Sequence, residues 1–141
     1  RLLHPAVHLH VMDRNGRIFL RRSAQRQNSC PGLWNMAVEG HVLYGETVME
    51  AILREAADGI GLGDFNPVAI GSYIHDSDKC RELVCVFAAL GHFDFNPGLD
   101  KQVDGRWVDL KEFEKNTGKG VFSPVLVSEY RRVRKQLVSL L

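Results

Sequence analysis

Residues 6–12 alternate between apolar and polar side chains, and this period-2 pattern predicts a half-buried β-strand. His8 and His10 alternate with the apolar residues, so we expect them to be hydrogen-bonded surface residues rather than ligands of a metal or substrate. Asn15-Gly16 follows as a dipeptide typical of tight hairpins, and residues 18–20 return to apolar character. The chain is therefore expected to open with a β-hairpin.

The pattern changes to a helical period at Thr47. Thr47 and Glu50 have the spacing of a capping box, in which each side chain accepts a hydrogen bond from the other residue's backbone N–H. Glycines crowd residues 59–63 and predict that this helix ends near Asp58. A second helix is predicted from Ser123-Pro124, an N-cap followed by proline at the first helical position. Its apolar stripe recurs every three or four residues, at Leu126, Tyr130, Val133, Leu137 and Leu140.

Shorter apolar stretches predict the remaining strands, at residues 33–38, 68–75, 83–90 and 106–108. Residues 23–32 are polar, contain Pro-Gly and are interpreted as a loop. No internal repeat or linker interrupts the 141 residues, a length that one hydrophobic core usually serves. We therefore expect a single α/β or α+β domain over residues 1–141, with a mixed sheet. Because the chain begins with Arg1 rather than methionine, we also expect the native N-terminus to lie further upstream.

Charge and cysteine content exclude several classes of protein. The chain carries 18 Lys and Arg against 17 Asp and Glu, and a net charge of +1 gives no field suited to a nucleic-acid polymer. The basic run at residues 131–135 is interpreted as the solvated side of the C-terminal helix. Cys30, Cys80 and Cys85 show no CxxC spacing, which excludes a zinc finger or disulfide scaffold and favours a cytoplasmic location. The longest apolar stretch, residues 83–90, is shorter than the ~20 residues of a membrane span.

Candidate chemistry concentrates in residues 40–62. Glu55 and Asp58 are three residues apart on the predicted helix, so their carboxylates share one face, and Glu46 lies in the loop before it. Such a cluster suits Mg²⁺, which takes one or two carboxylates and completes its shell with water and phosphate oxygens. Arg54 stands beside this face and could orient a carboxylate. The alternative is an ordinary solvated face on which Arg54 forms helical ion pairs.

The same segment resembles the Nudix box, which reads Gly, five residues, Glu, seven residues, Arg-Glu-apolar-any-Glu-Glu-any-Gly-apolar. Seven of the nine specified positions match, at Gly40, Glu46, Arg54, Glu55, Ala56, Gly61 and Leu62. Asp58 replaces one glutamate conservatively, and Gly59 replaces the last glutamate outright. The resemblance implies a Nudix α/β/α sandwich with a mixed β-sheet. It also implies Mg²⁺- or Mn²⁺-dependent hydrolysis of a diphosphate linkage in a nucleoside diphosphate derivative.

The resemblance assigns roles to individual residues. Glu55 and Arg54 are the expected catalytic residues, and the expected metal site comprises Glu55, Asp58, Glu46 and Gly40. Arg21, Arg22 and Tyr44 are candidates for substrate contact, since arginine binds phosphate through paired hydrogen bonds and tyrosine can stack. Because Gly59 removes a carboxylate and is a poor helix former, we expect weak metal binding, slow turnover and an Asp58 splayed away from Glu55. The expected partner is a small diphosphate, and a homodimer is a further expectation from the family.

Within the superfamily, the chain looks most like the isopentenyl-diphosphate isomerase branch. The matching segments are Leu2-Leu3-His4, residues 31–34, Gly40-His41, Glu82 followed by residues 86–89, and Trp107. The resemblance implies an alternative divalent-metal site at His4, His41 and Glu82. Glu39, however, stands where those isomerases carry a catalytic cysteine, which argues against isomerase turnover. A ligand-binding or regulatory Nudix domain without turnover is the other alternative, and Gly59 motivates it.

Overall fold

The computed structural model describes residues 3–23, 32–93 and 103–141. Its elements follow one another as β1 (Leu3–Met12), β2 (Arg17–Ser23), β3 (Trp34–Met36), β4 (Val38–His41), α1 (Val48–Ile60), β5 (Val68–Asp76), β6 (Arg81–Leu90), β7 (Val103–Asp109), α2 (Leu110–Lys115) and α3 (Pro124–Ser139). The predicted opening hairpin and both long helices are present. The predicted strand at 33–38 is two short strands, and Cys30 lies outside the described residues.

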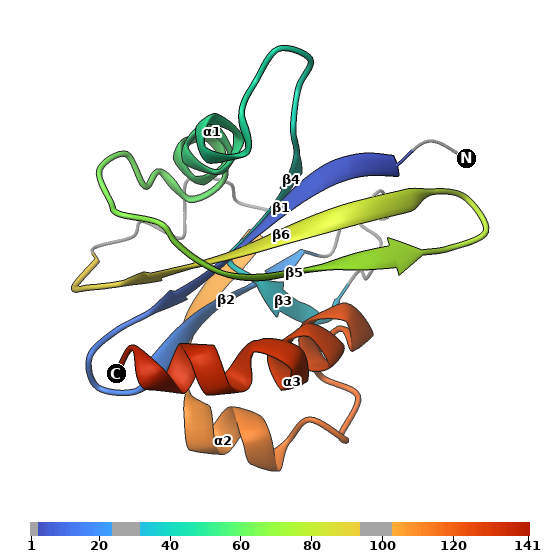
Figure 1. Ribbon diagram of the computed structural model, residues 1–141. Coiled ribbons are helices and arrows are strands. Elements are labelled where there is room, and N and C mark those ends of the chain that lie inside the picture. The colour runs from blue at the N-terminus through green and yellow to red at the C-terminus, as the bar shows by residue number, and fades with distance from the viewer. Residues whose placement is uncertain (1–2, 24–31, 94–102) are drawn as a thin grey trace.

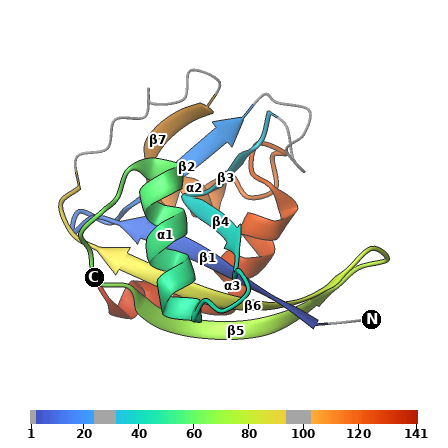
Figure 2. The ribbon, with the colours of Figure 1, turned by 90° about the horizontal axis from the view of Figure 1, so that it is seen from above.

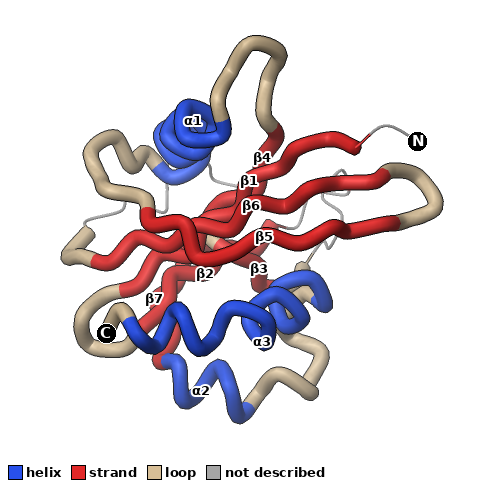
Figure 3. Tube along the Cα trace, viewed as in Figure 1, coloured by secondary structure: helices blue, strands red, loops and turns tan. Residues whose placement is uncertain are grey.

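The strands form one seven-stranded mixed sheet. Its main order is β3-β2-β1-β6-β5, with β4 paired to β1 and β7 paired to β2. The central strand β1 runs parallel to β6 and antiparallel to β2 and β4. Helix α1 covers one face of the sheet, and α2 and α3 cover the other, as Figures 1 and 3 show. The predicted α/β/α sandwich is confirmed.

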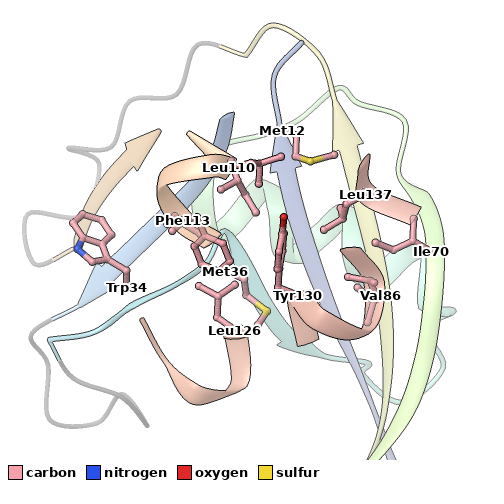
Figure 4. Packing of buried hydrophobic residues seen from close by; sticks show 14 of the residues in the cluster. Met12, Trp34, Met36, Ile70, Val86, Leu110, Phe113, Leu126, Tyr130 and Leu137 are labelled. Carbon is pink, nitrogen blue, oxygen red and sulfur yellow. The ribbon is translucent and has the colours of Figure 1, made fainter. Parts of the chain in front are cut away.

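Two hydrophobic cores lie on the two faces of this sheet. The α1-side core packs Val7, Leu9 and Val11 of β1 against the buried residues of the helix, Ala51, Ile52, Ala56 and Ile60. The view from above shows α1 lying across the strands (Figure 2). The α3-side core joins α2 and α3 to the opposite face through residues such as Met12, Met36, Phe113, Leu126 and Tyr130 (Figure 4).

The prediction that β1 is half-buried is wrong, because helices cover both faces of the sheet. Every residue from Ala6 to Met12 is buried. His8 is 7% exposed and His10 is 0% exposed, so the expectation that both histidines lie on the surface is also wrong. The alternating pattern marked two interior faces rather than one interior and one solvated face. A buried polar group needs a hydrogen-bond partner, and both histidines have one in Glu129.

Helix α1 begins as predicted and ends later than predicted. Thr47 and Glu50 form the expected capping box. The helix continues through Gly59 to Ile60, and Gly61 caps it in the left-handed conformation at φ 69°. Burial of Ile60 holds this last turn against the sheet, so Gly59 does not end the helix. The expected splaying of Asp58 is therefore wrong, because Asp58 stays on the same continuous helix as Glu55.

The described thiols Cys80 and Cys85 are free. Asp109 caps the short helix α2, which has too few turns to show a helical period in the sequence. The basic residues at 131, 132, 134 and 135 are exposed, as predicted.

Across the described ranges, none of the helices has both the length and the apolar character that crossing a membrane requires.

Candidate active site

Arg54 joins three segments of the chain on the α1 face. Its Nε donates to Glu46 Oε2 at 2.8 Å and its Nη2 donates to Glu46 Oε1 at 3.0 Å. Nη1 donates to Glu55, and Nη2 also donates to the backbone carbonyl of His41 at 2.9 Å. The guanidinium therefore ties α1 both to the loop before it and to β4. We call Arg54, Glu46, Glu55 and the His41 carbonyl the Arg54 cluster.

Glu55 lies directly against Gly40. A Cβ atom at position 40 would stand 1.6 Å from Glu55 Oε2 and 2.2 Å from its Cδ, so a larger residue would displace the carboxylate. Gly40 of β4 pairs with Val7 of β1. Because Val7 lies in the α1-side core, Gly40 faces that core as well. The match of Gly40 and Glu55 to the Nudix box therefore has a steric meaning. The glycine makes room for the carboxylate that Arg54 holds.

The charges of the Arg54 cluster reinforce one another. The paired hydrogen bonds from Arg54, together with the Leu43 amide, lower the pKa of the Glu46 carboxyl. The same bonds to Glu46, followed by the bond to Glu55, raise the pKa of Arg54 above its ordinary value. Arg54 and Glu46 consequently keep their ionic forms over the physiological range. Glu46 uses both oxygens on Arg54, and its Oε1 also accepts a hydrogen bond from the Leu43 amide.

The remaining predicted site residues, Asp58, Arg21 and Tyr44, lie in different surroundings. Asp58 is exposed on α1. Arg21 lies near the end of that helix, because its Nη1 is 3.4 Å from the position of a Cβ on Gly59 and donates to the Ala37 carbonyl at 3.5 Å. A cation thus lies beside the position where the Nudix box has its last glutamate. Tyr44 is fully exposed on the loop before α1.

Arg22 does not join Arg21. Successive residues of a strand point to opposite faces, and Arg22 stacks over the Trp34 ring at 4.7 Å and donates to Asp104 at 2.9 Å. Trp34 belongs to the α3-side core, so the two predicted phosphate contacts are on different sides of β2. Only Arg21 is placed near the Arg54 cluster.

A metal ion at the box would have a small set of protein ligands. No group of three or more His, Cys, Asp or Glu side chains among the described residues is arranged to hold one. The Glu55 carboxylate seated on Gly40 and the exposed Asp58 remain. This set fits a hydrated Mg²⁺ or Mn²⁺ ion that takes one or two carboxylates and completes its shell with water and substrate oxygens. It does not provide a closed cage.

A second cluster surrounds Glu129 on the α3 face, and sequence reasoning missed it. Glu129 Oε1 accepts a hydrogen bond from the Tyr73 hydroxyl at 2.5 Å and contacts His8 Nδ1 at 2.6 Å, while Oε2 contacts His10 Nε2 at 2.6 Å. Glu129 is 1% exposed. We call Glu129, His8, His10 and Tyr73 the Glu129 cluster. The missed signal was a single acidic residue three positions after Leu126, within the apolar stripe of α3.

Burial and pairing oppose each other in the Glu129 cluster. Burial alone would raise the pKa of Glu129, but hydrogen bonds from His10 and His8 outweigh it and hold that pKa well below its usual range. Burial would likewise lower the pKa of His8, but Glu129 and the nearby carboxylates of Glu39 and Glu82 raise it. The cluster therefore contains a buried carboxylate stabilised by imidazole donors.

The alternative metal residues lie at one end of the same face. His4, Glu82 and His75 are direct neighbours on β1, β6 and β5, and His41 Nε2 contacts Glu82 Oε2 at 3.1 Å. His75 was not anticipated, because its place in this row depends on strand register. Only the contact between His41 and Glu82 forms in the described structure. Glu39 is held by Asn35 Nδ2 at 2.5 Å, with its Oε2 3.8 Å from His8 Nε2.

A sequence model of the NUDIX domain matches residues 2–126. The chain belongs to the Nudix family. An isopentenyl-diphosphate Delta-isomerase of Brevibacterium linens is 27% identical over 143 aligned positions, covering 93% of this chain and 76% of that protein. An uncharacterized Nudix hydrolase, YfcD of Salmonella typhi, is 25% identical over 112 positions, covering 79% of this chain and 61% of that protein. These relatives confirm the resemblance both to the family and to its isomerase-like branch.

Solved structures confirm the fold of this Nudix domain. The MutT protein from Methanosarcina mazei Go1 superposes with a TM-score of 0.76 at 18% identity, covering 96% of both chains. The NUDIX domain of Shewanella oneidensis NrtR, solved as a complex with ADP ribose, superposes with a TM-score of 0.75 at 12% identity. That comparison covers 97% of this chain and 90% of the other.

Proposed function

We propose that this Nudix domain hydrolyses a diphosphate linkage in a nucleoside diphosphate derivative with the help of Mg²⁺ or Mn²⁺. The observation that carries the proposal is the Glu55 carboxylate, seated on Gly40 and held by an arginine that Glu46 fixes from the other side. Membership of the Nudix family supports hydrolase chemistry in general. The substrate class, the metal and the residue roles belong to this proposal.

Glu55 and Asp58 are the residues that would hold the ion, which would neutralise charge developing on the phosphate oxygens. Arg54 fixes the orientation of Glu55 and leaves its other oxygen beside Gly40. In that position Glu55 could also accept a proton from the attacking water. The water oxygen bonds to phosphorus as the bridging oxygen leaves. Arg21 would donate to a substrate phosphate near the end of α1.

The test is phosphorus NMR of a panel of nucleotide sugars and dinucleotides, incubated with Mg²⁺, with Mn²⁺ or with EDTA. We expect hydrolysis that needs the added metal in the wild type and that is lost in Glu55→Gln, which removes a charge at nearly constant shape. Glu112→Gln is the matched control, since it neutralises an exposed carboxylate on α2, across the sheet. An equal rate in Glu55→Gln and Glu112→Gln would contradict the proposed role of Glu55.

A nucleotide-binding domain without turnover is the second candidate. It is favoured by Gly59 and by the small ligand set on α1. The NrtR domain, whose structure contains ADP ribose, motivates ADP ribose as the probe. Calorimetry would show saturable binding of ADP ribose that Arg21→Gln weakens, with no phosphate product after long incubation. Turnover of the bound probe would decide for the hydrolase.

The isomerase-like alternative is tested with isopentenyl diphosphate as the substrate. His41 and Glu82 are in contact, and relatives named isopentenyl-diphosphate Delta-isomerase support it. Conversion of isopentenyl diphosphate by the wild type, lost in His41→Ala, would identify that chemistry. Equal metal affinity in the wild type and in a His4→Ala/His41→Ala double variant would eliminate the metal site. Glu39 in place of the cysteine leads us to expect no conversion.

A further inference from the structure

A cavity of about 440 Å³ opens between β5 and the start of α3, on the face opposite the Arg54 cluster. Its lining consists of Tyr73, Ile74, His75, Asp76, Pro124, Val125, Ser128 and Arg132. Figure 1 shows β5 running beside α3 at this edge of the sheet. Pockets that bind small molecules commonly enclose ~300–1,000 Å³, so the cavity is large enough for a metabolite. The proposed hydrolase does not use it.

Arg132 gives the cavity its charge. Its guanidinium stacks over the Tyr73 ring at 4.7 Å, and within the described residues it forms no ion pair. Arg134, two residues later, is instead paired with Glu114 at 3.1 Å. The first turn of α3, whose Pro124 and Val125 also line the cavity, contains no acidic residue. Asp76, the acidic residue of the lining, has Arg81 at 3.9 Å.

The wall beside this cation is both apolar and fixed. Ile74 is 48% exposed, and Pro124 and Val125 line the cavity with it. The hydroxyl of Tyr73 is bonded to buried Glu129, which holds the ring on which Arg132 stacks. A charged group and an apolar surface are thus presented side by side, before any ligand arrives. Such preorganisation reduces the entropy that binding must overcome.

We propose that this cavity binds a small organic anion, a carboxylate or a phosphate monoester with an apolar body. The anionic group pairs with Arg132, whose planar guanidinium can donate two parallel hydrogen bonds. The apolar body lies against Ile74 and Val125, and the Ser128 hydroxyl is available as a further donor. The site is independent of the Arg54 cluster, and it stands whether or not the domain hydrolyses diphosphates.

The test is a titration of the ¹⁵N-labelled full chain with phenyl phosphate and with benzoate, followed by amide NMR. We expect saturable shifts at residues 73–76 and 125–132 for at least one of them. Phenol and inorganic phosphate, which carry only one half of the recognised chemistry, should bind at least ~10-fold more weakly, equivalent to about 1.4 kcal/mol. Shifts confined to the surroundings of Glu55, or no saturable shift with either anion, would overturn the proposal.

Two matched pairs of variants separate a built site from general attraction to a basic helix. Arg132→Gln should weaken binding at least ~10-fold, whereas Arg131→Gln, which removes the neighbouring exposed charge outside the lining, should change it less than ~2-fold. Ser128→Glu places a carboxylate in the cavity and should abolish binding, while Gln136→Glu on the same helix should not. Equal effects within each pair would overturn the proposal.

Discussion

The Arg54 cluster and the Glu129 cluster use opposite arrangements of charge on the two faces of one sheet. In the Arg54 cluster, one arginine is paired with two carboxylates beside α1, and the arginine side chain is 29% exposed. In the Glu129 cluster, one carboxylate contacts two imidazoles and a tyrosine beneath α3, and the carboxylate side chain is 0% exposed. The strand β4 separates them, because Gly40 faces Glu55 while Glu39 faces His8.

The difference in burial assigns the two clusters different tasks. Ion pairs in contact with water contribute little to stability, and their members can exchange partners with a ligand. A buried charge is stable only while its partners are complete, and losing one partner leaves the others uncompensated. The Arg54 cluster is therefore suited to binding and chemistry. The Glu129 cluster is suited to joining β1, β5 and α3.

The largest effect should come from Glu129→Ala. This change leaves Tyr73, His8 and His10 without their shared acceptor in the protein interior. We expect a loss of about 3–5 kcal/mol in the free energy of unfolding, measured by urea titration. Glu112→Ala, an exposed control on α2, should change it by less than about 0.5 kcal/mol. A similar loss in both variants would show that Glu129 is not a structural centre.

Gly40→Ala should break the Arg54 cluster without removing any charge. The new Cβ would coincide with the Glu55 carboxylate and push it away from Arg54. We expect the metal-dependent hydrolysis proposed above to fall at least ~100-fold, in the range of losing a general base. Gly71→Ala is the matched strand control, because its Cβ would meet Val133 Cγ1 at an ordinary 3.7 Å. Equal activity in the two variants would contradict the importance of this contact.

Gly59→Glu should have a smaller and more informative effect. It restores the carboxylate of the Nudix box on the exposed side of α1, so we expect tighter Mg²⁺ binding and hydrolysis faster by up to ~10-fold, a change of about 1.4 kcal/mol. The new side chain also begins 3.4 Å from Arg21 Nη1, and an ion pair there would limit the gain.

Gly59→Ala separates the restored ligand from the better helix former. Alanine should stabilise the helix by up to about 1 kcal/mol without changing metal affinity. Unchanged metal binding and unchanged rate in Gly59→Glu would show that this departure from the family does not limit the site. The same conclusion would follow if the wild type already turned over at a typical ~10 s⁻¹.

Local signals in the sequence predicted the elements but not the Glu129 cluster. The Asn15-Gly16 turn, the capping box at Thr47 and the proline after Ser123 act over a few residues, and the structure confirms all three. The contact between His8 and Glu129 joins residues 121 positions apart, so no local pattern contains it. It depends on α3 covering the second face of β1.

The candidate site was predicted better than its surroundings. A contiguous motif brought Glu46, Arg54 and Glu55 into register, and the structure places them in contact. The end of α1 was misjudged because burial of Ile60 outweighs the low helix propensity of Gly59. Residue roles and metal affinity are not determined by position alone, so they remain predictions.

The smallest effect should be the pH dependence that His8 gives to the Glu129 cluster. Its folded pKa is raised above the ordinary 6.5, so the stability that protonated His8 contributes is fully present below pH 6.5. It is lost as the pH rises through the higher folded value. The pKa of Glu129 is lowered from 4.5, so its contribution is present above pH 4.5 and is lost only as the pH falls through the lower folded value. Both contributions are therefore complete between pH 4.5 and 6.5.

His8→Asn tests this window, because the asparagine amide can still donate to Glu129 but cannot titrate. We expect the wild type to exceed His8→Asn in free energy of unfolding by the largest margin near pH 5.5, and the margin to shrink as the pH rises above 6.5. His92→Asn, at an exposed histidine, should show no such trend. The ion pair of Arg54 and Glu46 should contribute no slope over this range, because the pKa of Arg54 is raised and that of Glu46 is lowered. A margin that is constant from pH 5.5 to pH 9 would mean that His8 stays neutral in the fold.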